Sequence, residues 1–226
     1  MVQTENLMSI RTQLDELRAQ LPQDVALVAV SKTYPVAALE EAYAAGQRLF
    51  GESRAQEMAV KQAALPNDVA WHMIGHLQTN KVRSIIPFVS LIHSVDSQRL
   101  LNVIDSEAAR AGRTIEILLE IHIAQEATKE GWEEAELFNY LHGGEFRELR
   151  NVRFRGVMGI ASLTSDETQI ETEFRRLQSI FERLRSDFFS PSFDILSMGM
   201  TADWRIAVAC GSNMIRVGSL IFGERS

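Results

Sequence analysis

The chain has 226 residues, of which 46% are hydrophobic, so it can bury one sizeable core and we expect a single domain over residues 1–226. Its 23 basic and 30 acidic residues give a formal net charge of -7, which argues against a general affinity for nucleic acid or for an anionic membrane surface. Cys210 is the only cysteine, and no apolar run has the length of a signal sequence or a membrane span, so the sequence predicts a soluble, cytoplasmic protein without disulfides.

Strand and helix patterns alternate along the chain. An amphipathic helix is predicted first, because apolar residues recur at helical spacing from Leu7 to Leu21, and a buried strand is expected at residues 25–31. Further strands are expected at residues 48–52, 69–75, 90–95, 114–123, 152–160, 193–199 and 213–219. Helices are expected between them at residues 36–46, 53–65, 78–87, 97–112, 133–143, 166–188 and 201–211.

Eight strands alternating with helices predict a parallel sheet, since the connections are too short for another arrangement. Eight such units close into a barrel, so the expected fold is α/β, a single (β/α)8 TIM barrel with an extra N-terminal helix. An open doubly wound sheet is the alternative, because strand order is not visible in a sequence. That fold favours a glycine-rich loop after the first strand, whereas the segment SKTYP at residues 31–35 has no glycine.

Lys32 ends the first predicted strand, where chemistry gathers in such a barrel. One interpretation is a strand end that surfaces into solvent. The other is an amine that forms a Schiff base with an aldehyde, because a partly desolvated lysine is shifted toward its neutral, nucleophilic form. Only four of the 23 basic residues are lysines, so a lysine at this position favours the chemical interpretation.

Two glycine turns predict an anion site at the ends of the last two strands. Gly218 and Ser219 follow an apolar strand and precede a short apolar segment, a layout that can direct backbone N–H groups at a phosphate. Gly199 permits an unusual turn after the seventh strand, and Thr201 stands where a helix N-cap is expected. Phosphate sites after strands seven and eight recur in this fold.

Arg216 lies two residues before Gly218, so both face the same side and the arginine sits deeper in the barrel. Its acceptor is either a neighbouring carboxylate or a ligand atom below the phosphate. A phosphorylated pyridine aldehyde, with its aldehyde on Lys32 and its ring nitrogen at Arg216, satisfies all three predicted contacts. The predicted cofactor is therefore pyridoxal 5'-phosphate.

Seven segments together resemble the YggS/PROSC family of pyridoxal phosphate homeostasis proteins, which share a fold with the N-terminal barrel of alanine racemase. The segments are LVAVSKTYP, FGESRAQE, WHMIGHLQTNK, TKEG (residues 128–131), RGVMGI, LSMGMTAD and GSNMIRVGSLIFG, in order between Ala26 and Gly223. The resemblance implies that Lys32 is the Schiff base lysine and that Arg216 faces the pyridine nitrogen.

The same resemblance places three residues around the phosphate: Thr201, Gly218 and Ser219. Met198, within LSMGMTAD, is assigned to the cofactor site as well. Ser53 is also assigned there, but it stands where the family usually has an asparagine, so that contact is expected to be weaker or moved. Thr201 replaces a serine and keeps the hydroxyl.

Three functions compete for such a site: an amino acid racemase or decarboxylase, a carrier or buffer of the cofactor, and a protein that its ligand merely keeps folded. Racemisation needs an acid or base opposite Lys32, and none of Tyr34, Tyr43 and Tyr140 can be placed there from sequence. Arg216 can only donate to the pyridine nitrogen, which leaves the ring a weak electron sink.

We therefore expect a non-catalytic protein that takes part in intracellular pyridoxal phosphate homeostasis by storage or delivery, with a minor amino acid racemase as the alternative. The expected partners are free amino acids and apo enzymes that depend on the cofactor, with no nucleic acid and no membrane, and we expect a monomer. No metal site is predicted, because Gly75 breaks the segment between His72 and His76 and they do not share a helical face.

Overall fold

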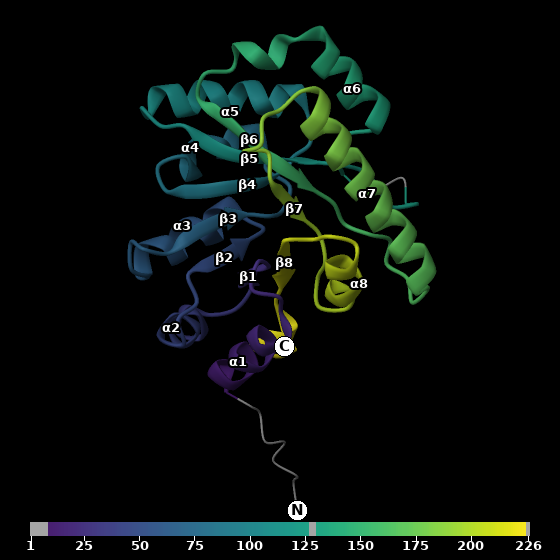
Figure 1. Cartoon of the computed structure of the whole chain (residues 1–226). Coiled ribbons are helices and arrows are strands. Elements are labelled where there is room, and N and C mark those ends of the chain that lie inside the picture. Colours follow the sequence, from purple (N-terminus) through teal and green to yellow (C-terminus); the bar gives the residue numbers. More distant parts are fainter. Residues whose placement is uncertain (1–8, 127–129, 225–226) are drawn as a thin grey trace, which may run out of the picture.

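Eight parallel strands pair in chain order and close into a barrel in the computed structural model, which describes residues 9–126 and 130–224 (Figure 1). The strands are β1 (Ala26–Val30), β2 (Leu49–Glu52), β3 (Ala70–Met73), β4 (Val89–Val95), β5 (Ile115–Glu120), β6 (Val152–Met158), β7 (Ile195–Ser197) and β8 (Met214–Val217). Strand β1 pairs with β8, Ala29 opposite Val217, and this closure confirms the barrel over the open sheet.

Helices follow the strands and surround the barrel, as Figure 1 shows for α5 to α8. They are α1 (Ile10–Gln20), α2 (Val36–Ala44), α3 (Ala55–Ala64), α4 (Val82–Ile85), α5 (Gln98–Arg110), α6 (Glu134–Gly143), α7 (Glu167–Asp187), α8 (Trp204–Ala209) and α9 (Ser219–Phe222). The described residues also form the 3-10 helices η1 (Thr79–Lys81) and η2 (Glu145–Glu148). The expected N-terminal helix is therefore present as α1, and the predicted helix at residues 78–87 is divided into η1 and the single turn α4.

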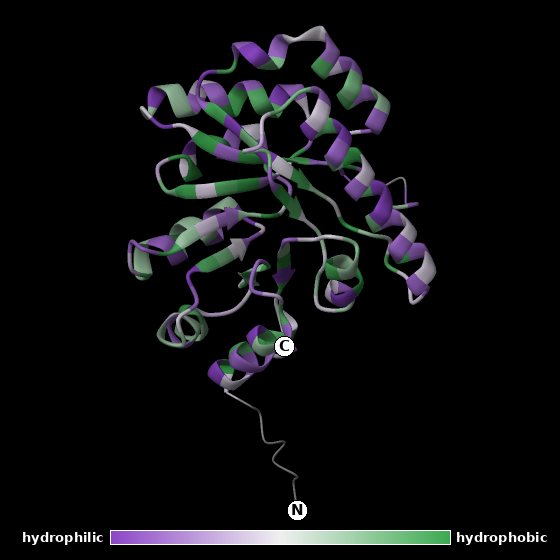
Figure 2. Cartoon of the chain, in the orientation of Figure 1, coloured by the Kyte–Doolittle hydropathy of each residue, from purple (hydrophilic) through white to green (hydrophobic). Residues whose placement is uncertain are grey.

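Helix α7 illustrates how the outer layer is held. Asp166 caps its N-terminus by accepting bonds from the N–H groups of Thr168 and Gln169. Apolar side chains at helical spacing face the barrel, including those of Phe174, Leu177 and Phe181. In Figure 2 the strands are mainly hydrophobic, whereas the helices alternate hydrophobic and hydrophilic residues. No helix in the described residues is long and apolar enough to cross a membrane.

The barrel interior has an apolar layer below a polar layer. Five buried side chains from five strands form the apolar layer: Val28, Leu91, Leu118, Met158 and Met214. Strands that are not neighbours can only meet inside the barrel, so these side chains point inward. Two residues further along their strands, His93, Glu120 and Arg216 point inward as well, nearer the carboxyl ends. The fold thus places buried polar groups directly beneath the barrel mouth.

Candidate functional site

The turns that follow β1, β7 and β8 come together at the carboxyl end of the barrel. Lys32 is partly buried in the turn after β1. Gly218, at the end of β8, packs so closely on β1 that an added Cβ would lie 3.0 Å from the carbonyl oxygen of Val30. The pairing of β1 with β8 therefore sets the Lys32 turn beside the predicted phosphate turn.

Thr201 and Ser219 join the turns after β7 and β8. The hydroxyl of Ser219 lies 3.1 Å from that of Thr201, to which it donates a hydrogen bond. Ser219 is the first residue of α9, and the first N–H groups of a helix have no acceptor within that helix. These N–H groups and the two hydroxyls supply the donors that a phosphate requires.

Gly199 shapes the turn that carries Thr201. Its φ is +96°, and an added Cβ would lie 2.6 Å from the Cβ of Ala207, so no larger residue fits here. Met198, just before it, is fully buried in the main hydrophobic core, and its assignment to the cofactor site stays a prediction. The strain-free turn after β7 thus depends on glycine.

A buried ion cluster supports the Lys32 turn. The ammonium of Lys61 on α3 donates to the carbonyl oxygen of Ser31 at 2.7 Å and to the carboxylates of Glu52 at 2.8 Å and Glu57 at 2.6 Å. The carboxylate of Glu57 also accepts the N–H of Thr33 at 2.6 Å. The backbone on both sides of Lys32 is therefore anchored to α3 and β2.

Thr33 adopts a φ of 71°, in the left-handed region that β-branched residues rarely occupy. This conformation costs on the order of 1–3 kcal/mol and persists only where the surroundings hold it. Its bond to Glu57 provides that hold. The pKa of Glu57 is lowered: burial raises it, but the bonds from Lys61 and from the Thr33 N–H outweigh that effect, so Glu57 stays charged.

Arg216 is 3% exposed inside the barrel. Its guanidinium donates to the Ser197 hydroxyl at 2.7 Å and to the carbonyl oxygen of Gly159 at 2.9 Å. Both acceptors are neutral. Neither of them is the neighbouring carboxylate that the sequence offered as one of two acceptors for Arg216. Burial lowers the pKa of Arg216 to about 10, and the side chain remains cationic at neutral pH. A guanidinium has five N–H donors, so Arg216 can also donate to a ligand.

Two buried histidines continue this network. The Nδ1 atom of His93 lies 3.1 Å from the Ser197 hydroxyl, and its Nε2 atom lies 2.9 Å from Nδ1 of His72. Burial lowers the pKa of His72 to about 4 and that of His93 well below its ordinary value. Both rings are therefore neutral near pH 7. The hydrogen bonds can then all run in one direction, with Arg216 donating to Ser197, Ser197 to His93, and His93 to His72.

Glu120 is the acidic group of this interior layer, 6% exposed at the end of β5. Its Oε2 atom is buried and has no hydrogen-bond partner among the described residues. Burial raises the pKa of Glu120 to about 8, with further contributions from the charges of Glu130 and Asp96. The carboxyl is therefore mostly protonated at neutral pH and does not neutralise Arg216.

Ser53 occupies a different part of the mouth. It lies partly exposed after β2 and lines a pocket of about 290 Å³ together with Arg54, His76 and Lys81. An added Cβ on Gly75 would lie 2.6 Å from the Cβ of Ser53, so the turns after β2 and β3 are in close contact. Ser53 thus lies with the turns after β2 and β3 rather than with the hydroxyl pair after β7 and β8, and its role in the cofactor site stays a prediction.

The predicted separation of His72 and His76 is seen in the structure, since His72 bonds to His93 inside the barrel while His76 is exposed beyond β3. Sequence analysis missed the Lys61 cluster and the contact between His72 and His93. The signal for Lys61 was its place in the apolar stretch AVKQAAL, where a lysine on the inner face of a helix needs buried partners.

Comparison with known proteins gives the family of this chain. The family model described as "Alanine racemase, N-terminal domain" matches residues 6–226. The chain is 35% identical to the pyridoxal phosphate homeostasis protein of Vibrio alginolyticus, over 98% of this chain and 97% of the relative. It is 38% identical to the protein of that name from Synechocystis sp., over 93% and 96% of the two chains.

Solved structures agree with this assignment. PipY of Synechococcus elongatus, solved with PLP bound, superimposes with a TM-score of 0.87 at 40% identity, covering 95% of this chain and all of PipY. Alanine racemase of Clostridium difficile matches with a TM-score of 0.78 at 14% identity, over 97% of this chain and 60% of the racemase, which shows a shared fold alone. The chain belongs to the family of pyridoxal phosphate homeostasis proteins, whose barrel is that of the alanine racemase N-terminal domain.

Proposed function

We propose that this protein binds pyridoxal 5'-phosphate at the barrel mouth and takes part in its intracellular homeostasis. The observation that carries the proposal is the convergence of the Lys32 turn, the cationic Arg216 and the hydroxyl pair of Thr201 and Ser219 on one end of the barrel. The relatives named as pyridoxal phosphate homeostasis proteins, and PipY with PLP bound, support the same ligand.

Each group has a part that matches its chemistry. The hydroxyls of Thr201 and Ser219 and the N–H groups at the start of α9 would hold the phosphate. Arg216 would donate to the ring nitrogen, from a position fixed by Ser197 and Gly159. Lys32 would hold the aldehyde as a Schiff base, on a turn made rigid by Lys61 and Glu57. When bound, the cofactor supplies an aldehyde that condenses reversibly with amines.

Storage or delivery suits this site better than racemisation. The hydroxyl of Tyr34 donates to the carbonyl oxygen of Gly223 at 2.5 Å, and that of Tyr43 donates to Asp68 at 2.8 Å. Tyr140 stacks on the buried Trp132, and burial raises its pKa to about 12. All three tyrosines of the chain are thus engaged in structural contacts, which argues against any of them as the second acid or base.

The experiment is reduction of the purified protein with borohydride after loading with pyridoxal phosphate, followed by peptide mapping. We expect one adduct, on Lys32, and its loss in Lys32→Ala. The matched control is Lys81→Ala, which removes an amine that lines the neighbouring pocket. An adduct on Lys81 alone would contradict the assignment of Lys32.

A second experiment separates a carrier from an enzyme. The loaded protein should restore the activity of an apo enzyme that depends on pyridoxal phosphate, faster in the presence of a free amino acid, and should not racemise alanine. Steady racemisation that disappears in Lys32→Ala would support the racemase instead. A monomeric, cytoplasmic protein remains part of the proposal, and sedimentation and cell fractionation test these two points.

A further inference from the structure

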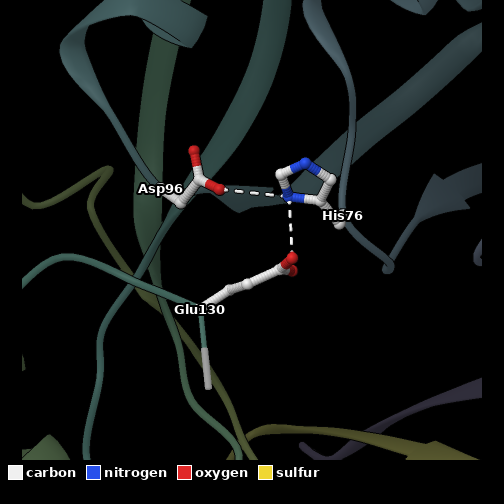
Figure 3. A group of neighbouring side chains, drawn as sticks. All are labelled: His76, Asp96 and Glu130. Atoms are coloured by element: carbon white, nitrogen blue, oxygen red, sulfur yellow. Dashed lines mark ion pairs between the residues drawn. The ribbon is translucent and has the colours of Figure 1, made fainter. Parts of the chain in front are cut away.

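Three side chains with metal-binding atoms meet at the rim of the barrel, after β3, β4 and β5 (Figure 3). The Nδ1 atom of His76 lies 3.3 Å from Oδ2 of Asp96 and 3.1 Å from Oε1 of Glu130. The three ligand atoms all lie within 4.8 Å of one another. Residues from three separate loops thus direct one nitrogen and two oxygen atoms at a common point.

This cluster is distinct from the site proposed for pyridoxal phosphate, which lies after β1, β7 and β8. It also differs from a metal site made of His72 and His76, which the sequence argued against. His72 bonds to His93 inside the barrel and is not part of this cluster. The partners of His76 are two carboxylates from later strands, which sequence spacing could not bring together. Neither the proposed cofactor site nor the interior network uses these three side chains.

The spacing of the ligand atoms fits a metal ion. Zinc binds histidine nitrogen and carboxylate oxygen at about 2.0–2.2 Å. Two ligands at that distance lie about 3.0 Å apart at a right angle and about 3.4 Å apart at a tetrahedral angle. The separations of 3.1 and 3.3 Å from His76 to its two carboxylates fall between these limits. The two carboxylate oxygens are held within 4.8 Å of each other, so Asp96 and Glu130 would have to turn toward each other to share one ion with His76.

The surroundings provide room for additional ligands. The three residues line a pocket of about 560 Å³ together with Asn80 and Ser97. The side chains of His76 and Glu130 are 49% and 48% exposed, so water can reach the point where their ligand atoms meet. Arg99 also lines the pocket. An ion bound there could complete its coordination with water, as in a zinc site that has three protein ligands.

The negative charges of Asp96 and Glu130 also affect a neighbouring buried carboxyl group, that of Glu120. One oxygen of this buried carboxyl has no hydrogen-bond partner in the part of the chain that the structure describes, and the charges of Glu130 and Asp96 both raise its pKa. Three carboxyl groups therefore share one side of the barrel mouth. A divalent cation held between Asp96 and Glu130 would relieve their mutual repulsion and reduce the field at Glu120.

We propose that His76, Asp96 and Glu130 form a binding site for a divalent first-row transition metal, with zinc as the reference ion. The mixed donor set argues for this class, because imidazole suits zinc and similar ions whereas magnesium favours oxygen ligands alone. The ion would tie together the loops after β3, β4 and β5. It would act as a structural clamp on the side of the mouth opposite the hydroxyl pair of Thr201 and Ser219.

The test uses the full chain, treated with EDTA and freed of pyridoxal phosphate, because the cofactor itself binds metals. Zinc alone is added in a calorimetric titration, and cobalt alone is added while its visible absorption is recorded. We expect one equivalent to bind, a rise in Tm, and cobalt bands typical of nitrogen and oxygen ligands. His76→Gln, Asp96→Asn and Glu130→Gln should each weaken binding by roughly tenfold or more.

The matched control is His122→Gln, because His122 also pairs with a surface carboxylate, its Nδ1 atom lying 2.6 Å from Glu133, but the described residues place no third metal-binding side chain beside this pair. This variant should bind zinc as the unaltered chain does, and magnesium should compete weakly. The proposal is overturned if no saturable binding is measured, or if the three cluster variants keep full affinity. A loss shared equally by His122→Gln would also overturn it.

Discussion

Arg216 on β8 donates to the hydroxyl of Ser197 on β7 across 2.7 Å of the barrel interior, and the same hydroxyl lies 3.1 Å from Nδ1 of His93 on β4. A single small side chain therefore links a cationic donor to a neutral histidine. The direction in which Arg216 points is set by neutral acceptors rather than by a carboxylate. This arrangement leaves its positive charge available to a ligand at the mouth.

Ser197→Ala should release Arg216 from that position. The variant leaves an N–H of Arg216 buried without its acceptor, so we expect a loss of about 1–3 kcal/mol in the free energy of unfolding, measured with urea. The visible spectrum of bound pyridoxal phosphate should also shift. Ser94→Ala is the control, because it removes a hydroxyl that donates to Gly75 at 2.6 Å and does not touch Arg216. Equal spectral shifts in both variants would argue against a positioning role for Ser197.

Thr201→Ala and Ser219→Ala should each weaken the binding of pyridoxal phosphate by about 1 kcal/mol, the usual contribution of one hydrogen bond. The two hydroxyls bond to each other at 3.1 Å, so the loss of binding free energy in the double variant should not equal the sum of the two single losses. Fluorescence titration provides the affinities. Affinities unchanged in both single variants would place the phosphate elsewhere.

Lys61→Met should destabilise the barrel by about 3 kcal/mol, because it leaves the fully buried carboxylate of Glu52 without its counter-ion. Burial already raises the pKa of Glu52, so the variant should take up a proton there at a higher pH than the unaltered chain does. Urea denaturation measures the loss. The control Lys81→Met changes a more exposed lysine and should have little effect, and Lys61→Met/Glu52→Gln should recover part of the stability.

Glu120 predicts a dependence of stability on pH. Its pKa is raised from 4.5 to about 8 in the folded state, mainly by burial. Between these values the folded chain holds a proton that the unfolded chain has released, so the free energy of unfolding falls as pH rises, by about 1.4 kcal/mol per unit. Glu120→Gln should lack this contribution. The free energy of unfolding of this variant, relative to that of the unaltered chain, should therefore increase from pH 5 to pH 8 when both are measured in EDTA. A difference that stays constant over this range would show that the pKa of Glu120 is not raised.

The barrel itself was predictable, since the alternation of apolar strands and amphipathic helices requires parallel pairing whatever the details of register. The positions of Lys32 and Ser219 just after their strands, and of Arg216 within the last strand, followed from the same alternation. The Lys61 cluster was not predictable in this way, because a helical lysine is usually solvated and its buried partners Glu52 and Ser31 lie on other elements.

The cluster at the rim was hidden for a related reason. Asp96 and Glu130 are separated by a strand and a helix, and only barrel closure brings their loops beside His76. Sequence periodicity states which face a residue occupies on its own element, but it carries no information on the distance between loops that follow different strands. The contact between His72 and His93 depends likewise on the register of β3 against β4, which shifts at His72.

The pairing of the first and last strands has a consequence for biosynthesis. Lys32 follows β1, whereas Arg216 and Gly218 belong to β8 and its end, and the two strands meet with Ala29 opposite Val217. As the chain emerges from the ribosome, the amine of Lys32 appears seven strands before its partners on β8. The mouth is therefore incomplete until β8 has been synthesised, and a ligand that bridges β1 and β8 would select molecules whose barrel has already closed.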